Sequence, residues 1–135
     1  MTRSTSRPDA FKQICPSREV MARLGEKWTM LLIVALENGP MRFGALRRKV
    51  EGISQKMLSK TARNLVRDGM LMRRLIYEKP LHVEYGLTER GYELLIVVRA
   101  LKTWTEKHLH AITANARLFD ENSRQDDATL RMGTL

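Results

Sequence analysis

Four cationic side chains recur along one short segment of the sequence, ISQKMLSKTARNLVRDG, residues 53–69. Lys56, Lys60, Arg63 and Arg67 follow one another at spacings of four, three and four, and no acidic residue interrupts them. Their chemistry is anion binding, because ammonium and guanidinium groups combine positive charge with N–H donors that suit phosphate oxygens. A solvated helix face is the alternative, although such faces usually mix acidic and basic residues to avoid like-charge repulsion. A uniform stripe therefore favours contact with a polyanion such as a nucleic acid.

An amphipathic helix over residues 55–68 is the element that would hold these cations together. At about 100° per residue the cations fall on one arc, and the opposite arc carries Leu58, Thr61, Ala62 and Leu65. Ser54 is placed to cap the N-terminus, and Gly69 suits the left-handed position after the last turn. The spacing therefore predicts a helix that is basic on one side and faces a core on the other.

The elements around this helix indicate a winged helix-turn-helix. A short helix is predicted over residues 44–50, and the glycine-containing turn of residues 51–53 joins it to the basic helix, which is the helix-turn-helix pattern. Residues 81–87 then alternate apolar and polar, and residues 71–76 can pair with them across a turn at residues 77–80. A β-hairpin, or wing, therefore follows the basic helix directly.

Three further helices are predicted, over residues 17–24, 27–37 and 89–118. The second of them is apolar nearly all round and is expected at the centre of the core. The last carries more apolar residues than a small domain can bury, and a partner chain would cover them. The predicted fold is mainly α with a small β-hairpin. It forms one domain over residues 14–118, between a disordered arm of residues 1–13 and a flexible tail of residues 119–135.

Composition narrows the class of protein. The chain has 135 residues, one cysteine and a formal net charge of +9, and residues 42–67 hold eight cations against one acid, Glu51. The longest apolar run, residues 30–36, is far shorter than the ~20 residues that cross a bilayer, and the N-terminus lacks the apolar run of a signal peptide. We therefore expect a cytoplasmic protein that binds double-stranded DNA and no membrane. A single thiol excludes an intramolecular disulfide and a multi-thiolate zinc site.

No arrangement of residues suggests an enzyme, a metal site or a cofactor. The sequence has no nucleophile spaced with a base, no paired carboxylates and no glycine-rich phosphate loop. His82, His108 and His110 do not converge on a site, since residues two apart on a helix face different directions. We expect no catalytic residues, no metal ligands and no cofactor. The rival to a sequence-specific regulator is a sequence-independent architectural protein that binds DNA or RNA.

Three motifs stand in order along the chain: CPSREVMARLGEKWTMLLIVAL at residues 15–36, MRFGALRRKVEGISQKMLSKTARNLVRDGMLMRR at residues 41–74, and VEYGLTERG at residues 83–91. Together they resemble the HxlR family of bacterial winged helix-turn-helix transcriptional regulators, with Glu26 in the family's Gly-x-Lys-Trp element. The resemblance implies a homodimer held by the N-terminal and C-terminal helices. It also implies that the basic helix lies in the major groove, with the wing against phosphate or the minor groove.

The basic helix and the wing supply the candidate DNA contacts. Gln can bond adenine and Arg or Lys can bond guanine, whereas phosphate contacts carry no sequence information. The candidates for the groove are Gln55, Lys56, Ser59, Lys60 and Arg63, and Ser54 is a further candidate DNA contact. The candidates for phosphate, each of which could equally be an ordinary surface cation, are Arg42, Arg67, Arg73, Arg74 and Lys79.

Cys15, just before the first predicted helix, has two interpretations. Nearby Lys12 and Arg18, with the helix N-terminus, would lower its pKa and favour the reactive thiolate. Some members of the resembling family respond to oxidants or electrophiles through a cysteine at this place, so the resemblance implies a regulatory thiol with an oxidant or small-molecule effector. The alternative is a small hydrophobe packed under the first helix. As the only thiol in the chain, Cys15 would have to form a disulfide between subunits or a mixed adduct.

Overall fold

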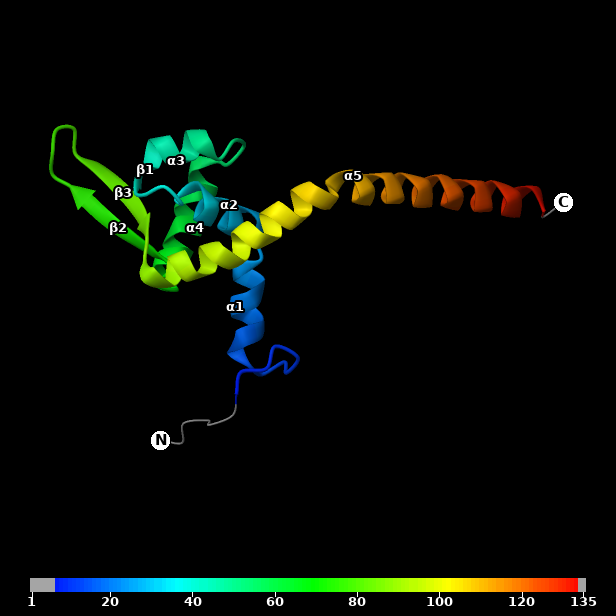
Figure 1. The fold of residues 1–135 in the computed structure, drawn as a ribbon, viewed down its shortest axis with the longest axis horizontal. Coiled ribbons are helices and arrows are strands. Elements are labelled where there is room, and N and C mark those ends of the chain that lie inside the picture. Colours follow the sequence, from blue (N-terminus) through cyan, green and yellow to red (C-terminus); the bar gives the residue numbers. More distant parts are fainter. Residues whose placement is uncertain (1–6, 134–135) are drawn as a thin grey trace. The chain divides into compact units, whose positions relative to one another are not determined.

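The computed structural model describes residues 7–133, and the contacts divide the chain into two units, Met1–Val98 and Arg99–Leu135. The helices are α1 (Pro16–Leu24), α2 (Lys27–Ala35), α3 (Phe43–Lys49), α4 (Gln55–Arg67) and α5 (Glu89–Met132), and the strands are β1 (Met41–Arg42), β2 (Leu71–Ile76) and β3 (His82–Leu87) (Figure 1). The first unit holds every element except the part of α5 after Val98. The predicted class, mainly α with a small β-hairpin, is confirmed.

The sheet has one strand that the sequence did not predict. β2 and β3 form the expected antiparallel hairpin, and the two-residue strand β1 adds to the other edge of β3, in the order β1-β3-β2. Two residues are too few to show an alternating pattern, so β1 left no signal in the sequence. Gly86 lets the chain before β1 approach closely, because a Cβ on Gly86 would lie 3.2 Å from Pro40 Cγ.

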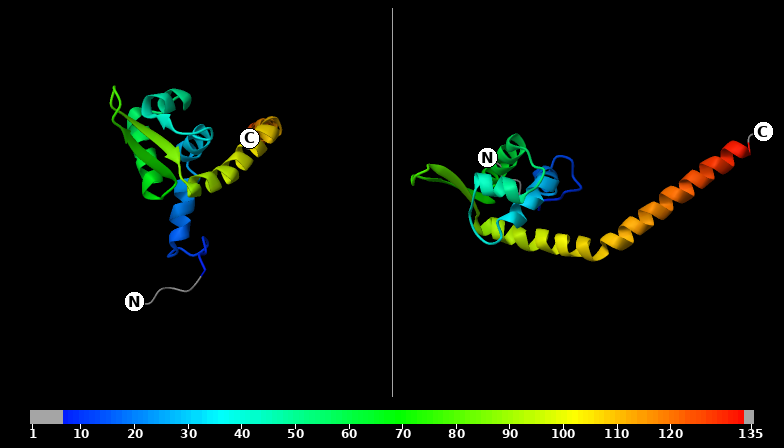
Figure 2. Two further views of the ribbon diagram at one scale, coloured as in Figure 1. Left: turned by 60° about the vertical axis from the view of Figure 1, so that its left-hand side comes forward. Right: turned by 90° about the horizontal axis from the view of Figure 1, so that it is seen from above.

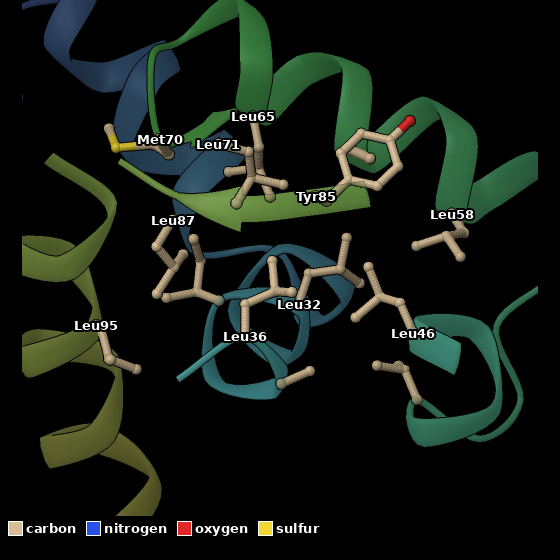
Figure 3. Close-up of a cluster of buried hydrophobic side chains, with 14 of the residues drawn as sticks. Leu32, Leu36, Leu46, Leu58, Leu65, Met70, Leu71, Tyr85, Leu87 and Leu95 are labelled. Atoms are coloured by element: carbon tan, nitrogen blue, oxygen red, sulfur yellow. The ribbon is translucent and has the colours of Figure 1, made fainter. Parts of the chain in front are cut away.

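The core of the first unit forms around α2, as predicted. Leu32, Ile33 and Leu36 are fully buried, and they lie among buried side chains from α3, α4, the sheet and the first turns of α5 (Figure 3). Leu46 of α3 and Leu58 of α4 are also fully buried. α2 ends at Ala35, two residues before the predicted end at residue 37. The helix-turn-helix is thus fixed to the core through both of its helices.

The first turn of α5 packs closely on the loop after α4. Thr88 caps the helix: its hydroxyl oxygen accepts the Gly91 N–H at 3.1 Å, and its own N–H bonds the Met70 carbonyl at 3.0 Å. Gly91 lies so close to the Met70 carbonyl oxygen that a Cβ there would overlap it. This contact joins the end of α4 to the start of α5.

α5 is longer than the sequence indicated. The predicted helix end near residue 118 is wrong, because the helix continues to Met132. The polar, mixed-sign composition after Leu118 suggested a tail, but no Gly or Pro occurs between Gly91 and Gly133 to stop a helix. The predicted boundary between a domain and a flexible tail at residue 118 therefore does not coincide with a helix end.

The segment before α1 forms hydrogen-bonded turns where a disordered arm was expected. The Arg18 guanidinium donates to the carbonyl oxygens of Ala10 and Phe11, each at 3.0 Å, and the Lys12 N–H donates to the Asp9 carbonyl. Arg18 thus ties the turn at Ala10 and Phe11 to α1. Residues 1–6 lie outside the described part. Among the described helices, none is both long and apolar enough to cross a membrane.

Candidate nucleic-acid interface

The two-sided character predicted for the basic helix is present in α4. Its inner side buries Leu58, Thr61, Ala62 and Leu65, and the helix packs against α2 and β2. Its outer side exposes the four cations Lys56, Lys60, Arg63 and Arg67, together with Gln55 and Ser59. One helix therefore presents all six side chains on a rigid, core-anchored support.

The ends of α4 are fixed by the residues that the sequence indicated. The Ser54 hydroxyl oxygen accepts the Met57 N–H at 3.0 Å, which caps the N-terminus and leaves the hydroxyl proton free to donate outward. Gly52 in the turn before α4 and Gly69 after it have φ angles of +87° and +80°, which favour glycine. These caps set the first turn of α4, with Ser54 and Gln55, at the exposed start of the helix.

The cations of α4 have no partner among residues 7–133. Lys56, Lys60, Arg63 and Arg67 make no ion pair or hydrogen bond there. On the neighbouring α3, by contrast, Lys49 donates to the Ala35 carbonyl at 3.1 Å. Four uncompensated cations on one helix create a local positive potential, which attracts a polyanion.

An ion pair that the sequence did not reveal ties α4 to α1. The Arg23 guanidinium donates to both carboxylate oxygens of Asp68, each at 3.1 Å. Asp68 is the first acidic residue after the cations of α4. It forms its ion pair with Arg23 and not with the neighbouring Arg67. The 45 residues that separate the partners explain why no local pattern predicted the pair.

The wing extends beyond the helices that cover its base (Figure 2). Cross-strand partners share a face of the sheet, and Arg73 lies opposite Tyr85, whose ring contacts Phe43 of α3 at 6.5 Å between centroids. Arg73 thus lies on the face that α3 covers, whereas Arg74 lies opposite Glu84 on the other face. The remaining phosphate candidates, Arg42 on β1 and Lys79 in the turn of the wing, are exposed.

This alternation gives different expectations for the two arginines of β2. We expect Arg73→Ala to weaken duplex binding about tenfold, because one lost phosphate contact is worth roughly 1 kcal/mol. Arg74→Ala, the matched control, should change the affinity less than about threefold, because Arg74 lies opposite Glu84 on the other face of the hairpin. Fluorescence anisotropy with a labelled duplex measures both. An equal loss of affinity in the two variants, or a larger loss for Arg74→Ala, would show that the face of the wing that carries Arg74 contacts the duplex.

Cys15 lies at the N-cap of α1, half-buried and outside the hydrophobic core of the first unit. The Ser17 hydroxyl, 3.1 Å from Sγ, holds the pKa of the Cys15 thiol below its ordinary value, and the Asp9 N–H at 3.3 Å acts in the same direction. The sequence-based expectation that Lys12 and Arg18 lower the pKa of Cys15 is wrong, since neither is a cause of the shift. The Arg18 guanidinium donates to backbone carbonyl oxygens instead. The helix N-terminus contributes through the Ser17 backbone.

Removal of the Ser17 hydroxyl should raise the pKa of Cys15. A lowered pKa means that more thiolate is present at a given pH, so Cys15 should react with iodoacetamide faster than an ordinary thiol at neutral pH. In Ser17→Ala the midpoint of the rate-versus-pH curve should move to higher pH, and alkylation at neutral pH should slow. Mass spectrometry of the alkylated chain measures the rate. An unchanged midpoint would exclude the Ser17 hydrogen bond as the cause.

The histidines do not form a metal site. His82 is 3.4 Å from the Glu84 carboxylate, and the His108 ring stacks on Trp104 at 4.4 Å between centroids. Over residues 7–133, no three His, Cys, Asp or Glu residues are grouped to hold a metal ion. The charged surface of α4 is therefore kept as the candidate site among the described residues.

The fold and this surface define a winged helix-turn-helix protein. The family model described as "HxlR-like helix-turn-helix" matches residues 23–113, and the chain belongs to that family. The uncharacterized HTH-type transcriptional regulator YtfH of Escherichia coli K12 is 42% identical over 104 residues, which are 77% of this chain and 82% of YtfH. The chain is therefore a transcriptional regulator of the helix-turn-helix type and not an enzyme.

Solved structures agree with this assignment. That of ytfH from Salmonella typhimurium has 40% sequence identity and a TM-score of 0.77, and the match covers 82% of this chain and 99% of that one. The redox regulator HypR in its reduced form has 32% identity and a TM-score of 0.67, with coverage of 73% and 98%. The resemblance seen in the three sequence motifs is thus confirmed at the level of family and fold.

Proposed function

We propose that this protein is a sequence-specific DNA-binding transcriptional regulator that acts as a homodimer. The observation that carries the proposal is the row of unpaired cations on α4, next to the wing of a helix-turn-helix fold. α4 lies in the major groove, where Gln55, Lys56, Ser59, Lys60 and Arg63 face base edges. Ser54 donates to phosphate at the start of the helix. The other phosphate contacts come from Arg42, Arg67, Arg73 and Lys79, and Arg74 contributes less because it lies on the far face of the wing.

Exposed apolar side chains support the homodimer. α1 buries none of its residues, and Met21 is 62% exposed. Along α5, Ile96, Val97 and Leu101 are 71%, 65% and 48% exposed. Such a concentration of apolar surface normally marks an interface between proteins. Two copies related by a two-fold axis would cover it and present two α4 helices to an inverted repeat.

The rival function is sequence-independent binding of DNA or RNA, which the same cations would support. Sequencing duplexes that the purified protein retains from a random pool separates the two. We expect an inverted repeat with half-sites about one helical turn apart, 10–10.5 base pairs, or slightly more. A retained pool without any enriched sequence would contradict the proposal and favour the rival.

We also propose that oxidation of Cys15 regulates DNA binding. Support comes from the lowered pKa of this thiol and from the similarity to HypR, which is a redox regulator. Two Cys15 thiols of a dimer can form one disulfide, passing two electrons and two protons to an oxidant such as diamide, which becomes the hydrazine. Diamide should then change the operator affinity of the wild type and leave Cys15→Ser unaffected. The same affinity for both proteins throughout would make Cys15 structural.

A further inference from the structure

Asp68, the C-cap residue of α4, is bound by the helix that precedes the helix-turn-helix motif and by the helix that follows the wing. Its carboxylate accepts two hydrogen bonds from the Arg23 guanidinium of α1, each at 3.1 Å. Its backbone carbonyl oxygen accepts one from the Arg90 guanidinium of α5, at 3.3 Å. All three residues belong to the first unit. One residue at the end of α4 therefore connects that helix to both α1 and the start of α5, and we call these contacts the Asp68 junction.

The position of α1 depends on this junction because the packing of α1 is slight. None of its nine residues is buried, and Leu24 in its last turn is only partly buried against the core. The Arg23–Asp68 pair is partly shielded from water, with side-chain exposures of 38% and 17%. A guanidinium that binds both oxygens of a carboxylate fixes the orientation of the two groups as well as their distance. The pair therefore sets the angle at which α1 meets α4.

The pair suits a role in orientation better than a role in stability. Ion pairs near the surface add little to the free energy of unfolding, because solvent screens them and two long side chains must be ordered. The end of α4 is also held to α5 without Arg23, since the Gly69 carbonyl oxygen accepts the Thr88 hydroxyl. Loss of the pair should therefore leave the first unit folded while it loosens the angle between α1 and α4.

This angle matters because α1 and α4 serve different contacts in the proposed homodimer. α1 and α5 supply the apolar surface between the subunits, whereas α4 enters the major groove. One base pair added between two half-sites moves them apart by about 3.4 Å and rotates them by about 35°. A dimer whose two α4 helices are fixed relative to the subunit contact fits one spacing of half-sites. A dimer with a loose junction would fit several.

We propose that Asp68 determines the half-site spacing that this regulator accepts. Its pair with Arg23, together with the hydrogen bond from Arg90, fixes α4 relative to the helices of the subunit contact. Asp68 is thus a positioning residue, and it reads no base itself. The inference rests on the proposed homodimer and names the residue that sets the geometry of its DNA binding.

Spacing selectivity tests this role. Anisotropy titrations compare the selected inverted repeat with duplexes that have one base pair inserted or removed between the half-sites. The wild type should bind the altered spacings about tenfold more weakly or worse, because protein or DNA must deform to fit them. In Arg23→Ala and in Asp68→Asn this penalty should fall below about threefold. The two variants shift the net charge in opposite directions, so a common loss of selectivity cannot arise from charge alone.

Two further variants control for charge and for separate effects. Glu51→Gln removes an exposed acid in the turn before α4, near the other end of the helix, and should keep the wild-type spacing penalty. The double variant Arg23→Ala with Asp68→Asn should lower the penalty no further than either single change, because both remove the same pair. An additive loss in the double variant would show that the two residues act separately and would contradict the proposal.

The remaining outcomes separate this inference from the proposed homodimer. Single variants that keep the wild-type penalty would overturn the role of Asp68 and leave the homodimer standing. A wild type that binds all spacings equally would overturn the homodimer, and the inference with it. Hydrogen exchange of the protein without DNA gives a further readout, since the amides of α1 should exchange faster in both single variants. Unchanged exchange would show that the pair does not hold α1, whatever the DNA titrations give.

Discussion

Replacement of Lys56, Lys60 and Arg63 by alanine in one chain is expected to reduce operator affinity by about 10²-fold or more. Each side chain that reads a base or phosphate contributes about 1–3 kcal/mol, and a tenfold change corresponds to about 1.4 kcal/mol. The variant should also lose salt dependence, because fewer counterions are released when fewer phosphates are neutralised. Anisotropy titrations from 50 to 200 mM salt measure the affinity and its slope.

The triple variant should remain folded, because all three side chains are exposed and unpaired among the described residues. Lys107→Ala is the control, since it removes an exposed cation of α5 that belongs to the second unit and is not part of the helix-turn-helix. We expect this control to bind the operator within about twofold of wild type. A triple variant with unchanged affinity would place the DNA-binding surface somewhere other than α4.

The second large effect is on stability, and it concerns the junction between α4 and α5. Gly91→Ala is expected to destabilise the first unit by about 1–3 kcal/mol or more, because a new Cβ would overlap the Met70 carbonyl oxygen. That carbonyl also accepts the Thr88 N–H, so moving it disturbs the cap of α5. For a unit of this size, the loss corresponds to a melting temperature lower by roughly 5–20 °C. Circular dichroism during heating measures the change.

Gly44→Ala is the matched control and should act in the opposite direction. Gly44 lies in α3 and is exposed, and its new Cβ would meet only the flexible end of Arg48 at 3.4 Å. Alanine in a helix is favoured over glycine by up to about 1 kcal/mol, so the melting temperature should rise slightly. If Gly91→Ala were as stable as the wild type, the close contact with Met70 would not hold the junction.

The sequence was sufficient for elements whose signal is local and periodic. The 3.6-residue spacing of α4, with Ser54 and Gly69 at its ends, predicted both the bounds of the helix and the side on which its cations lie. The alternation in residues 81–87 likewise predicted β3. The candidate contacts of α4 could be named from sequence because they follow one another on a single helix.

The features that the sequence did not predict depend on contacts between residues far apart in the chain, or on the absence of a residue that ends a helix. β1 exists because Met41 and Arg42 reach β3, more than forty positions away along the chain. The Arg23–Asp68 pair likewise depends on how two distant segments meet. α5 continues past residue 118 because nothing breaks it, and a polar composition alone does not end a helix.

The most direct test of the central claim is a comparison of two duplexes under identical conditions. One is the inverted repeat selected from the random pool, and the other has the same base composition in scrambled order. At about 150 mM salt, a sequence-specific regulator should bind the selected duplex about 10³-fold more tightly or better. Equal affinity for the two duplexes would contradict sequence-specific regulation and would leave a protein that binds nucleic acid by charge alone.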